Sequence, residues 1–104
     1  MLEFSDIDQR AKWICLHYAN QLGSSSLIGI IEGAVPVNSS EDALALSRFF
    51  WQMLEVSAAD RDKVAIVQGE VDLQYWMRRS INIISNYLRN LGYKEEWEQV
   101  FDET

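Results

Sequence analysis

Apolar residues recur every three or four positions along most of the chain, a spacing that predicts α-helices. The first run predicts a helix over 6–22 that ends at Gly23, because glycine readily adopts the left-handed backbone that follows a helix. Ser5, with Asp8 three residues later, is expected to cap this helix by accepting a free N–H of its first turn. The buried stripe of the helix is expected to contain Ile7, Ala11, Ile14, Tyr18 and Leu22.

The segment 24–37 is short and apolar, and its pattern fits two kinds of element. Three serines at 24–26 are expected to form a loop or a new cap. The apolar residues after them predict a short helix, with a strand as the alternative. Pro36 favours extended backbone at Val35, so residues 33–39 are expected to form a loop.

A wide apolar face predicts the next helix over 40–55. Ser39 and Ser40 precede it, and Glu41 and Asp42 place negative charge in its first turn, where the helix dipole favours that charge. The apolar face consists of Leu44, Leu46, Phe49, Phe50, Met53 and Leu54.

A second long apolar pattern follows. Ser57, with Asp60 three residues later, is another capping signal and is expected to begin this segment. Residues 62–92 then fit either one long helix or two helices separated at Gly69, because a glycine costs about 1 kcal/mol in a helix interior. Gly92 is expected to end the segment. Its apolar stripe is Leu73, Met77, Ile81, Ile84, Leu88 and Leu91.

A last helix is predicted over 93–102, with Trp97, Val100 and Phe101 on one side. The prediction is therefore an all-α single domain over 1–104, a bundle of four to five helices that run mostly antiparallel because their loops are short. Large aromatic side chains bury the most area, so the tryptophans are expected to meet where helices cross. These tryptophans are Trp13, Trp51, Trp76 and Trp97.

The formal net charge of −7 bears on the kind of partner. Binding to duplex nucleic acid or to an anionic membrane depends largely on basic residues. The negative net charge therefore argues against both of these partners and favours a basic protein as the partner. Cys15 is the only cysteine and cannot form an internal disulfide, which favours a reducing compartment. The acidic start of the chain lacks the apolar stretch of a secretory signal, and no apolar run approaches the roughly 20 residues of a membrane span. We therefore expect a cytoplasmic protein.

The residue types that carry chemistry do not form a catalytic pattern. Cys15 and His17 lie two residues apart on a predicted helix and point to different sides, so we expect a packed cysteine and a surface or boundary histidine rather than a catalytic pair. The acidic stretch 60–72 has its glycine at the wrong place for a calcium-binding loop. Paired carboxylates within that stretch also diverge. We expect no enzyme, with no catalytic residues, metal, cofactor or small-molecule substrate.

The placement of the charges is more informative than their sum. Residues 1–72 carry a net charge of −6, residues 73–91 carry +3 and residues 92–104 carry −4. In one interpretation the acidic C-terminal helix folds back on the basic helix, and in a second, compatible one its outer carboxylates bind a basic partner. The basic residues either form surface ion pairs or, beside Tyr75 or Tyr87, bind a phosphate or single-stranded RNA. They are Arg78, Arg79 and Arg89.

The sequence combines four features. It has about a hundred residues, one predicted domain, no catalytic set, and acidic residues at the predicted starts of its helices. These acids are Asp6, Asp8, Glu41, Asp42, Asp60 and Asp62. In this overall character the chain resembles the small acidic α-helical immunity proteins of bacterial toxin systems, including contact-dependent growth inhibition and colicin-like bacteriocins. The resemblance implies an inhibitor, or antitoxin, that binds and neutralises a cognate basic toxin, an RNase or a DNase.

The hypothesis is therefore a protein-binding inhibitor whose partner is a basic toxin domain. The alternatives are a helical adaptor, chaperone or phage-type regulator that binds a host protein, and an RNA-contacting module. Tyr93 and Trp97 are expected to anchor the partner if this end of the chain is exposed. The predicted partner-binding residues are Asp60, Asp62, Glu70, Asp72, Tyr93, Glu95, Glu96, Trp97, Glu98 and Asp102.

Overall fold

Every regular element among the described residues is a helix, so the predicted all-α class is confirmed. The computed structural model describes residues 2, 4–59 and 73–102. The elements in these residues are the 3₁₀ turn η1 (Asp6–Asp8) and the α-helices α1 (Gln9–Leu22), α2 (Ser25–Glu32), α3 (Ser40–Ala59), α5 (Leu73–Asn90) and α6 (Lys94–Phe101).

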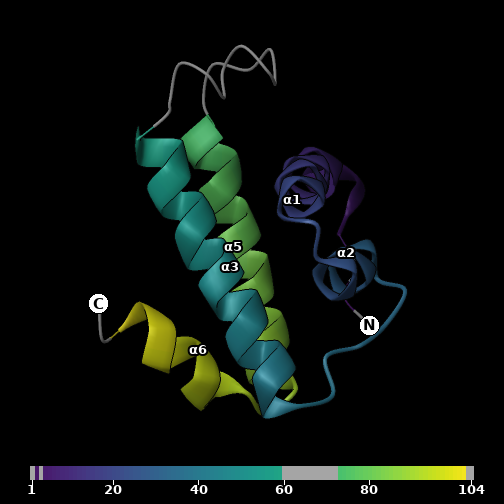
Figure 1. Cartoon of the computed structure of the whole chain (residues 1–104), viewed down its shortest axis with the longest axis vertical. Coiled ribbons are helices and arrows are strands. Elements are labelled where there is room, and N and C mark those ends of the chain that lie inside the picture. Colours follow the sequence, from purple (N-terminus) through teal and green to yellow (C-terminus); the bar gives the residue numbers. More distant parts are fainter. Residues whose placement is uncertain (1, 3, 60–72, 103–104) are drawn as a thin grey trace.

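The two longest helices, α3 and α5, lie side by side and run in opposite directions (Figure 1). The short helix α6 packs on both of them at one side. On the other side α1 packs against α5 and α2, and both α1 and α2 cross the long pair instead of running along it. The bundle therefore has an antiparallel centre with shorter helices across its two sides.

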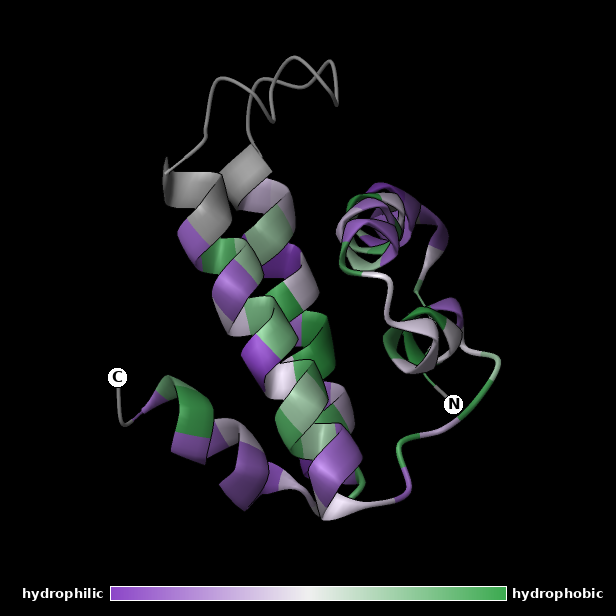
Figure 2. Cartoon of the chain, viewed as in Figure 1, coloured by the Kyte–Doolittle hydropathy of each residue, from purple (hydrophilic) through white to green (hydrophobic). Residues whose placement is uncertain are grey.

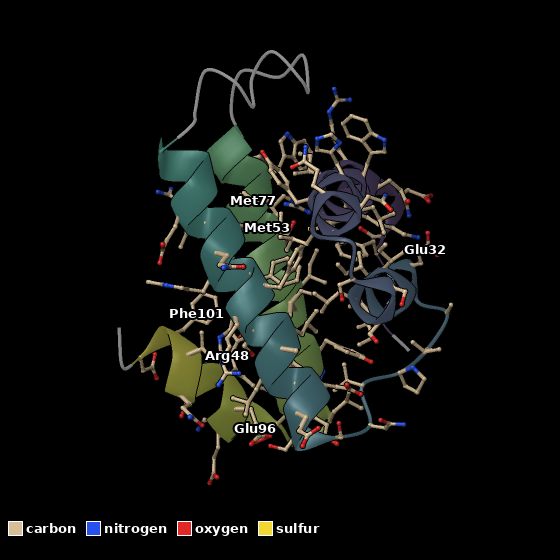
Figure 3. The ribbon with its side chains drawn as sticks, viewed as in Figure 1. Glu32, Arg48, Met53, Met77, Glu96 and Phe101 are labelled. Carbon is tan, nitrogen blue, oxygen red and sulfur yellow. The ribbon has the colours of Figure 1, made fainter. Side chains whose placement is uncertain are left out.

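One hydrophobic core joins all these helices. Phe49 and Phe50 of α3 are almost completely buried and meet edge to face, with ring centroids 5.2 Å apart. Met53 of α3 and Met77 of α5 point into the same core (Figure 3). Figure 2 shows that α6, in contrast, is mainly hydrophilic and contributes to the core from one side only. Packing of one side of α6 on the core thereby determines which side of the helix faces away from it.

Small side chains are buried within α1 and α5. Cys15 of α1 and Ser80 of α5 are both fully buried, and the two side chains are in hydrogen-bonding contact. The Ser80 hydroxyl also donates to the carbonyl of Trp76 at 2.8 Å. Small residues let two helix backbones approach closely, which accounts for the direct packing of α1 on α5.

The helix ends follow the local signals in the sequence. Gly23 and Gly92 have φ values of 71° and 93° and end their segments as predicted. The Ser24 hydroxyl accepts the N–H of Leu27 at 3.4 Å, so that 24–37 begins with a capped short helix rather than a strand. The Ser39 hydroxyl caps α3 in the same way, at 3.1 Å from the nitrogen of Asp42.

The N-terminal segment packs against the loop that follows α2. Leu2 and Phe4 are 4% and 9% exposed and belong to the core. Gly33 has a φ of 81°, and a Cβ atom added there would lie 2.5 Å from the carbonyl oxygen of Leu2. Only glycine satisfies both the left-handed backbone and the close approach at this position.

Two predicted caps are wrong. The Ser5 hydroxyl donates to the carboxylate of Asp8 at 2.6 Å and accepts no backbone N–H, because Asp8 is held by a distant arginine and presents its second oxygen to the serine. Ser57 does not begin a new segment but lies inside α3, whose predicted end at residue 55 is four residues too early. Two alanines after Ser57 favour continuation of the helix. The expected break at Gly69 lies outside the described residues.

Three apolar side chains that were expected inside are exposed. Trp13 is 52% exposed, so it does not meet the other tryptophans, and Leu22 and Leu91 are 58% and 43% exposed. Each lies on a helix, or at its end, at a position that no neighbouring helix covers. Helical spacing identifies the apolar side of a helix, whereas the neighbours decide how far along the helix that side is buried.

Candidate partner-binding surface

Helix α6 is held in place by its aromatic side chains. Trp97 is only 4% exposed and stacks on Phe101, with ring centroids 4.0 Å apart and an interplanar angle of 13°. Phe101 in turn meets Trp51 of α3 edge to face at 5.4 Å. Positions 97 and 101 lie one turn apart on the same side of the helix, which is the side that packs on α3 and α5. The predicted fold-back of the C-terminal helix is confirmed, with α3 as well as the arginine-bearing α5 as its support.

The opposite side of α6 is acidic. Glu95, Glu98, Gln99 and Asp102 recur at intervals of three and four residues and line a shallow depression of about 400 Å³. We name these four residues the acidic face of α6. Its only ion pair within the described part of the chain joins Lys94 Nζ to Glu98 Oε1 at 3.7 Å, and Lys94 is itself exposed. The face therefore keeps a negative charge that described residues neutralise only in part.

The helix dipole of α6 stabilises the negative charge of some acidic residues and destabilises that of another. Glu95 and Glu96 lie in the first turn of α6, where the positive end of the helix dipole stabilises negative charge. Asp102 is the residue that ends the helix, and its backbone N–H donates to the carbonyl of Glu98. At that end the dipole and the carboxylate four residues earlier both disfavour a negative charge. Asp102 thus has a charge that helix formation does not explain.

The remaining predicted partner residues divide into three groups. Trp97 is buried, so the condition for it to anchor a partner, an exposed C-terminal end, is not met. Tyr93 is half-buried, and its backbone joins α5 to α6 by donating to the carbonyl of Leu88 at 2.8 Å. Glu96 is half-buried and lies off the acidic face, near Arg48 in Figure 3. Four further predicted partner residues lie outside the described residues, namely Asp60, Asp62, Glu70 and Asp72.

The arginines of α5 are not equivalent. The Arg79 guanidinium donates from Nε to Asp8 Oδ1 at 2.5 Å and from Nη1 to the Tyr75 hydroxyl at 3.3 Å. The hydrogen bond from Ser5 is the main cause that holds the pKa of Asp8 below its ordinary value, and Arg79 adds to it, while partial burial opposes both. Arg79 therefore tethers the start of α1 to α5, as the ion-pair interpretation predicts. Arg78 and Arg89 are exposed.

Cys15 and His17 occupy the environments expected of them. Burial raises the pKa of the Cys15 thiol to about 12, although its contact with Ser80 acts in the opposite direction. A thiol with so high a pKa is a poor nucleophile at neutral pH. His17 is partly exposed, stacks on Trp13 with centroids 6.3 Å apart, and has its Nε2 atom 3.3 Å from Gln21 Nε2.

A groove between α1 and α3 is a feature that the sequence analysis missed. It has a volume of about 310 Å³ and a mostly apolar lining. Helical spacing had placed Leu22 in the buried stripe, so no local signal pointed to a cavity, which arises from the way α1 crosses α3. From α1 the lining includes Tyr18, Gln21 and Leu22, and from α3 it includes Phe49, Gln52, Met53 and Glu55.

Among the described residues, no three histidine, cysteine or acidic side chains are arranged to hold a metal ion. Within the same part of the chain, no helix has both the length and the apolar character needed to cross a membrane. Comparison of the chain with protein-family models, with curated proteins and with solved structures gave no match.

Proposed function

We propose that this protein binds a basic protein through the acidic face of α6 and neutralises it, in the manner of an immunity protein that inhibits a toxin. The observation that carries the proposal is the division of α6 into two sides. Trp97 and Phe101 hold one side in the core, and the other presents carboxylates that described cations neutralise only in part. A short helix fixed by buried aromatic groups presents these charges in a rigid arrangement.

A basic toxin fits this surface for a physical reason. Nucleases bind polyanions, so their substrate sites are positively charged, and an acidic inhibitor is attracted to the same sites. Long-range attraction of this kind raises the association rate by about 10- to 1000-fold at low salt. The net charge of −7 extends the attraction beyond the helix itself.

The arginine contacts make an RNA-binding function less well supported than protein binding. Of the three arginines that such a function would use, Arg79 is engaged by Asp8 and Tyr75. An adaptor or chaperone would use the same acidic face, so it differs from an inhibitor in what the bound partner does. The test must therefore measure the partner's activity as well as its binding.

The first experiment is affinity purification of the tagged protein from its native host at moderate salt, followed by co-expression with the protein that co-elutes. A single stoichiometric basic protein that is toxic alone and harmless in the complex is the expected result. A stoichiometric partner with no toxicity would favour the adaptor function. The absence of any partner would overturn the proposal.

Charge-reversal variants then locate the surface. Glu95→Lys and Asp102→Lys each change an exposed acid of the acidic face, and Glu32→Lys makes the same change on α2, on the opposite side of the molecule in Figure 3. We expect each of the first two to slow association by about three- to tenfold, with an effect that shrinks as salt rises. The Glu32 variant should associate almost as fast as the wild type. Equal effects at all three positions would indicate a response to net charge alone.

A further inference from the structure

The groove between α1 and α3 has the size and floor of an anchor pocket. Its volume of about 310 Å³ equals that of roughly ten water molecules in the liquid, which is enough for one large side chain. Phe49 and Met53 form an apolar floor and are 2% and 3% exposed. Leu22, which is 58% exposed, forms an apolar wall at the end of α1. An exposed leucine above buried apolar groups favours an occupant that removes it from water.

The rim of the groove is polar and carries one kind of charge. Gln21 and Gln52 supply amide groups, and Glu55 supplies a carboxylate. Glu55 is exposed and has no ion pair within the described part of the chain. An apolar centre surrounded by a polar rim is the usual anatomy of a protein–protein interface. The carboxylate adds a preference for a positively charged neighbour.

The groove and α6 both border helix α3. Gln52 and Glu55 are exposed on α3, and Trp51, next to Gln52, contacts Phe101 of α6. In Figure 1 the pair of helices α3 and α5 lies between α1 and α6. A partner that covers the outer side of α3 therefore reaches the groove on one side and α6 on the other. Arg48, seven residues before Glu55, lies roughly 10 Å away along the helix and leaves the rim of the groove acidic.

We propose that the groove receives one apolar or aromatic side chain of the basic partner, and that a lysine or arginine beside this side chain pairs with Glu55. The inference rests on the proposed function for the identity of the partner, and on the groove alone for the chemistry of the anchor. Buried anchors of this kind supply most of the affinity of an interface, whereas exposed charges mainly set the association rate. The two surfaces thus have different roles in one complex.

The chemistry of the groove is tested without the partner. Phenethylammonium is an aromatic cation, and 3-phenylpropanoate is an anion of similar shape. Each is titrated into the isotope-labelled full chain while NMR follows the methyl signals of Leu22 and Met53. We expect the cation to shift both signals with a millimolar dissociation constant and the anion to bind at least about threefold more weakly. The Glu55→Gln variant should bind the cation about two- to fivefold more weakly and lose the preference.

A pair of leucine variants tests the apolar wall. Leu22→Asp places a charge in the groove, and Leu91→Asp makes the same change at another exposed leucine, outside the groove. Both side chains are largely solvent-exposed, so both variants should fold, which circular dichroism verifies. We expect Leu22→Asp to abolish binding of phenethylammonium and to lower affinity for the purified partner about tenfold, mainly through faster dissociation. Leu91→Asp should leave both unchanged.

The possible outcomes separate this inference from the proposed function. If neither probe shifts the groove signals, or both bind equally, the anchor chemistry is wrong, while reversal of the acidic face can still slow association. If the probes behave as expected but the acidic face has no effect on the partner, the proposed function fails and the groove chemistry stands. Concentration-dependent dimers that Leu22→Asp abolishes would assign the groove to a second copy of the chain and overturn the inference.

Discussion

Replacement of Trp97 by alanine is the most direct test of the way α6 is held. The indole is 4% exposed and stacks on Phe101, so its removal deletes a large buried aromatic group and a ring contact. Replacement of a buried tryptophan by alanine typically costs about 3–5 kcal/mol. The total stability of a chain of 104 residues is about 5–15 kcal/mol, so Trp97→Ala is expected to remove a large share of it. An isolated helix of eight residues is not stable, and α6 should lose its structure.

Urea denaturation followed by circular dichroism measures this loss. With a denaturant slope of about 2 kcal/mol per molar urea, the transition midpoint of Trp97→Ala should fall by about 1.5–2.5 M. The matched variants are Glu95→Lys and Asp102→Lys, which alter exposed positions on the other side of the same helix. Glu95→Lys should cost no more than about 2 kcal/mol, because it removes a favourable interaction with the helix dipole and adds an unfavourable one, and Asp102→Lys should not destabilise the chain.

Two results would refute this reasoning. A cost below about 1 kcal/mol for Trp97→Ala would mean that the aromatic groups do not hold α6, and that the orientation of its acidic face is not fixed. A loss of stability in the charge-reversal variants as large as that of Trp97→Ala would mean that the carboxylates maintain the fold. In that case their charge would need no partner to explain it.

Three further results are expected. Because burial raises the pKa of Cys15 to about 12, its thiol should react with a disulfide reagent at pH 8 at least roughly a thousandfold more slowly in the native chain than in urea. Because the folded state lowers the pKa of Asp8 below 3.8, its contribution to stability is complete above that pH and is lost as the pH falls through the folded-state pKa. Asp8→Asn should therefore destabilise the chain more at pH 6 than at pH 2 in urea titrations, and an equal loss at both would contradict the linkage. Gly23→Ala should cost about 1 kcal/mol, because its backbone is left-handed but its surroundings are open. Gly33→Ala should cost at least twice as much, because a Cβ atom there meets the Leu2 carbonyl; equal thermal shifts in the two variants would refute that contact.

The elements that could be predicted from the sequence are those specified by residues close together in the chain. A helix end needs only a residue that adopts positive φ, and Gly23 and Gly92 both do so. A serine cap needs a free N–H three residues later, which Ser39 meets at Asp42. These signals act within a few residues, and the predicted bounds 6–22 and 93–102 lie close to those of η1 with α1 and of α6.

The contacts that could not be predicted depend on distant segments. Ser5 has the sequence of a cap, but Arg79, 71 residues from Asp8, fixes the Asp8 carboxylate where it accepts the serine hydroxyl. Leu22 has helical spacing within the apolar stripe of α1, yet it is 58% exposed. Burial of one side of a helix is a property of the assembled fold, and a single helix does not contain that information.

The candidate surface was predictable to the same limited extent. The acids of the last helix and its apolar positions could be separated by spacing, and that separation places Glu95 and Asp102 outside. The same spacing assigned Trp97 to the core in one interpretation and to the surface in the other, and only the packing on α3 and α5 decides between them. The groove exists because α1 and α3 cross in the folded chain, and no pattern in the sequence indicated that crossing.

The charges of α6 can be weighed against what the helix gains from them. The carboxylates of its first turn contribute about 0.3–1 kcal/mol each through the helix dipole, and the contact between Lys94 and Glu98 adds less than about 1 kcal/mol. Asp102 has the opposite effect, because it lies at the negative end of the dipole and four residues after Glu98. Mutual repulsion within the acidic face costs a few tenths of a kcal/mol per pair. A basic partner placed over the acidic face would attract the same carboxylates and offset their mutual repulsion. The arrangement of charges therefore favours association more than it favours folding.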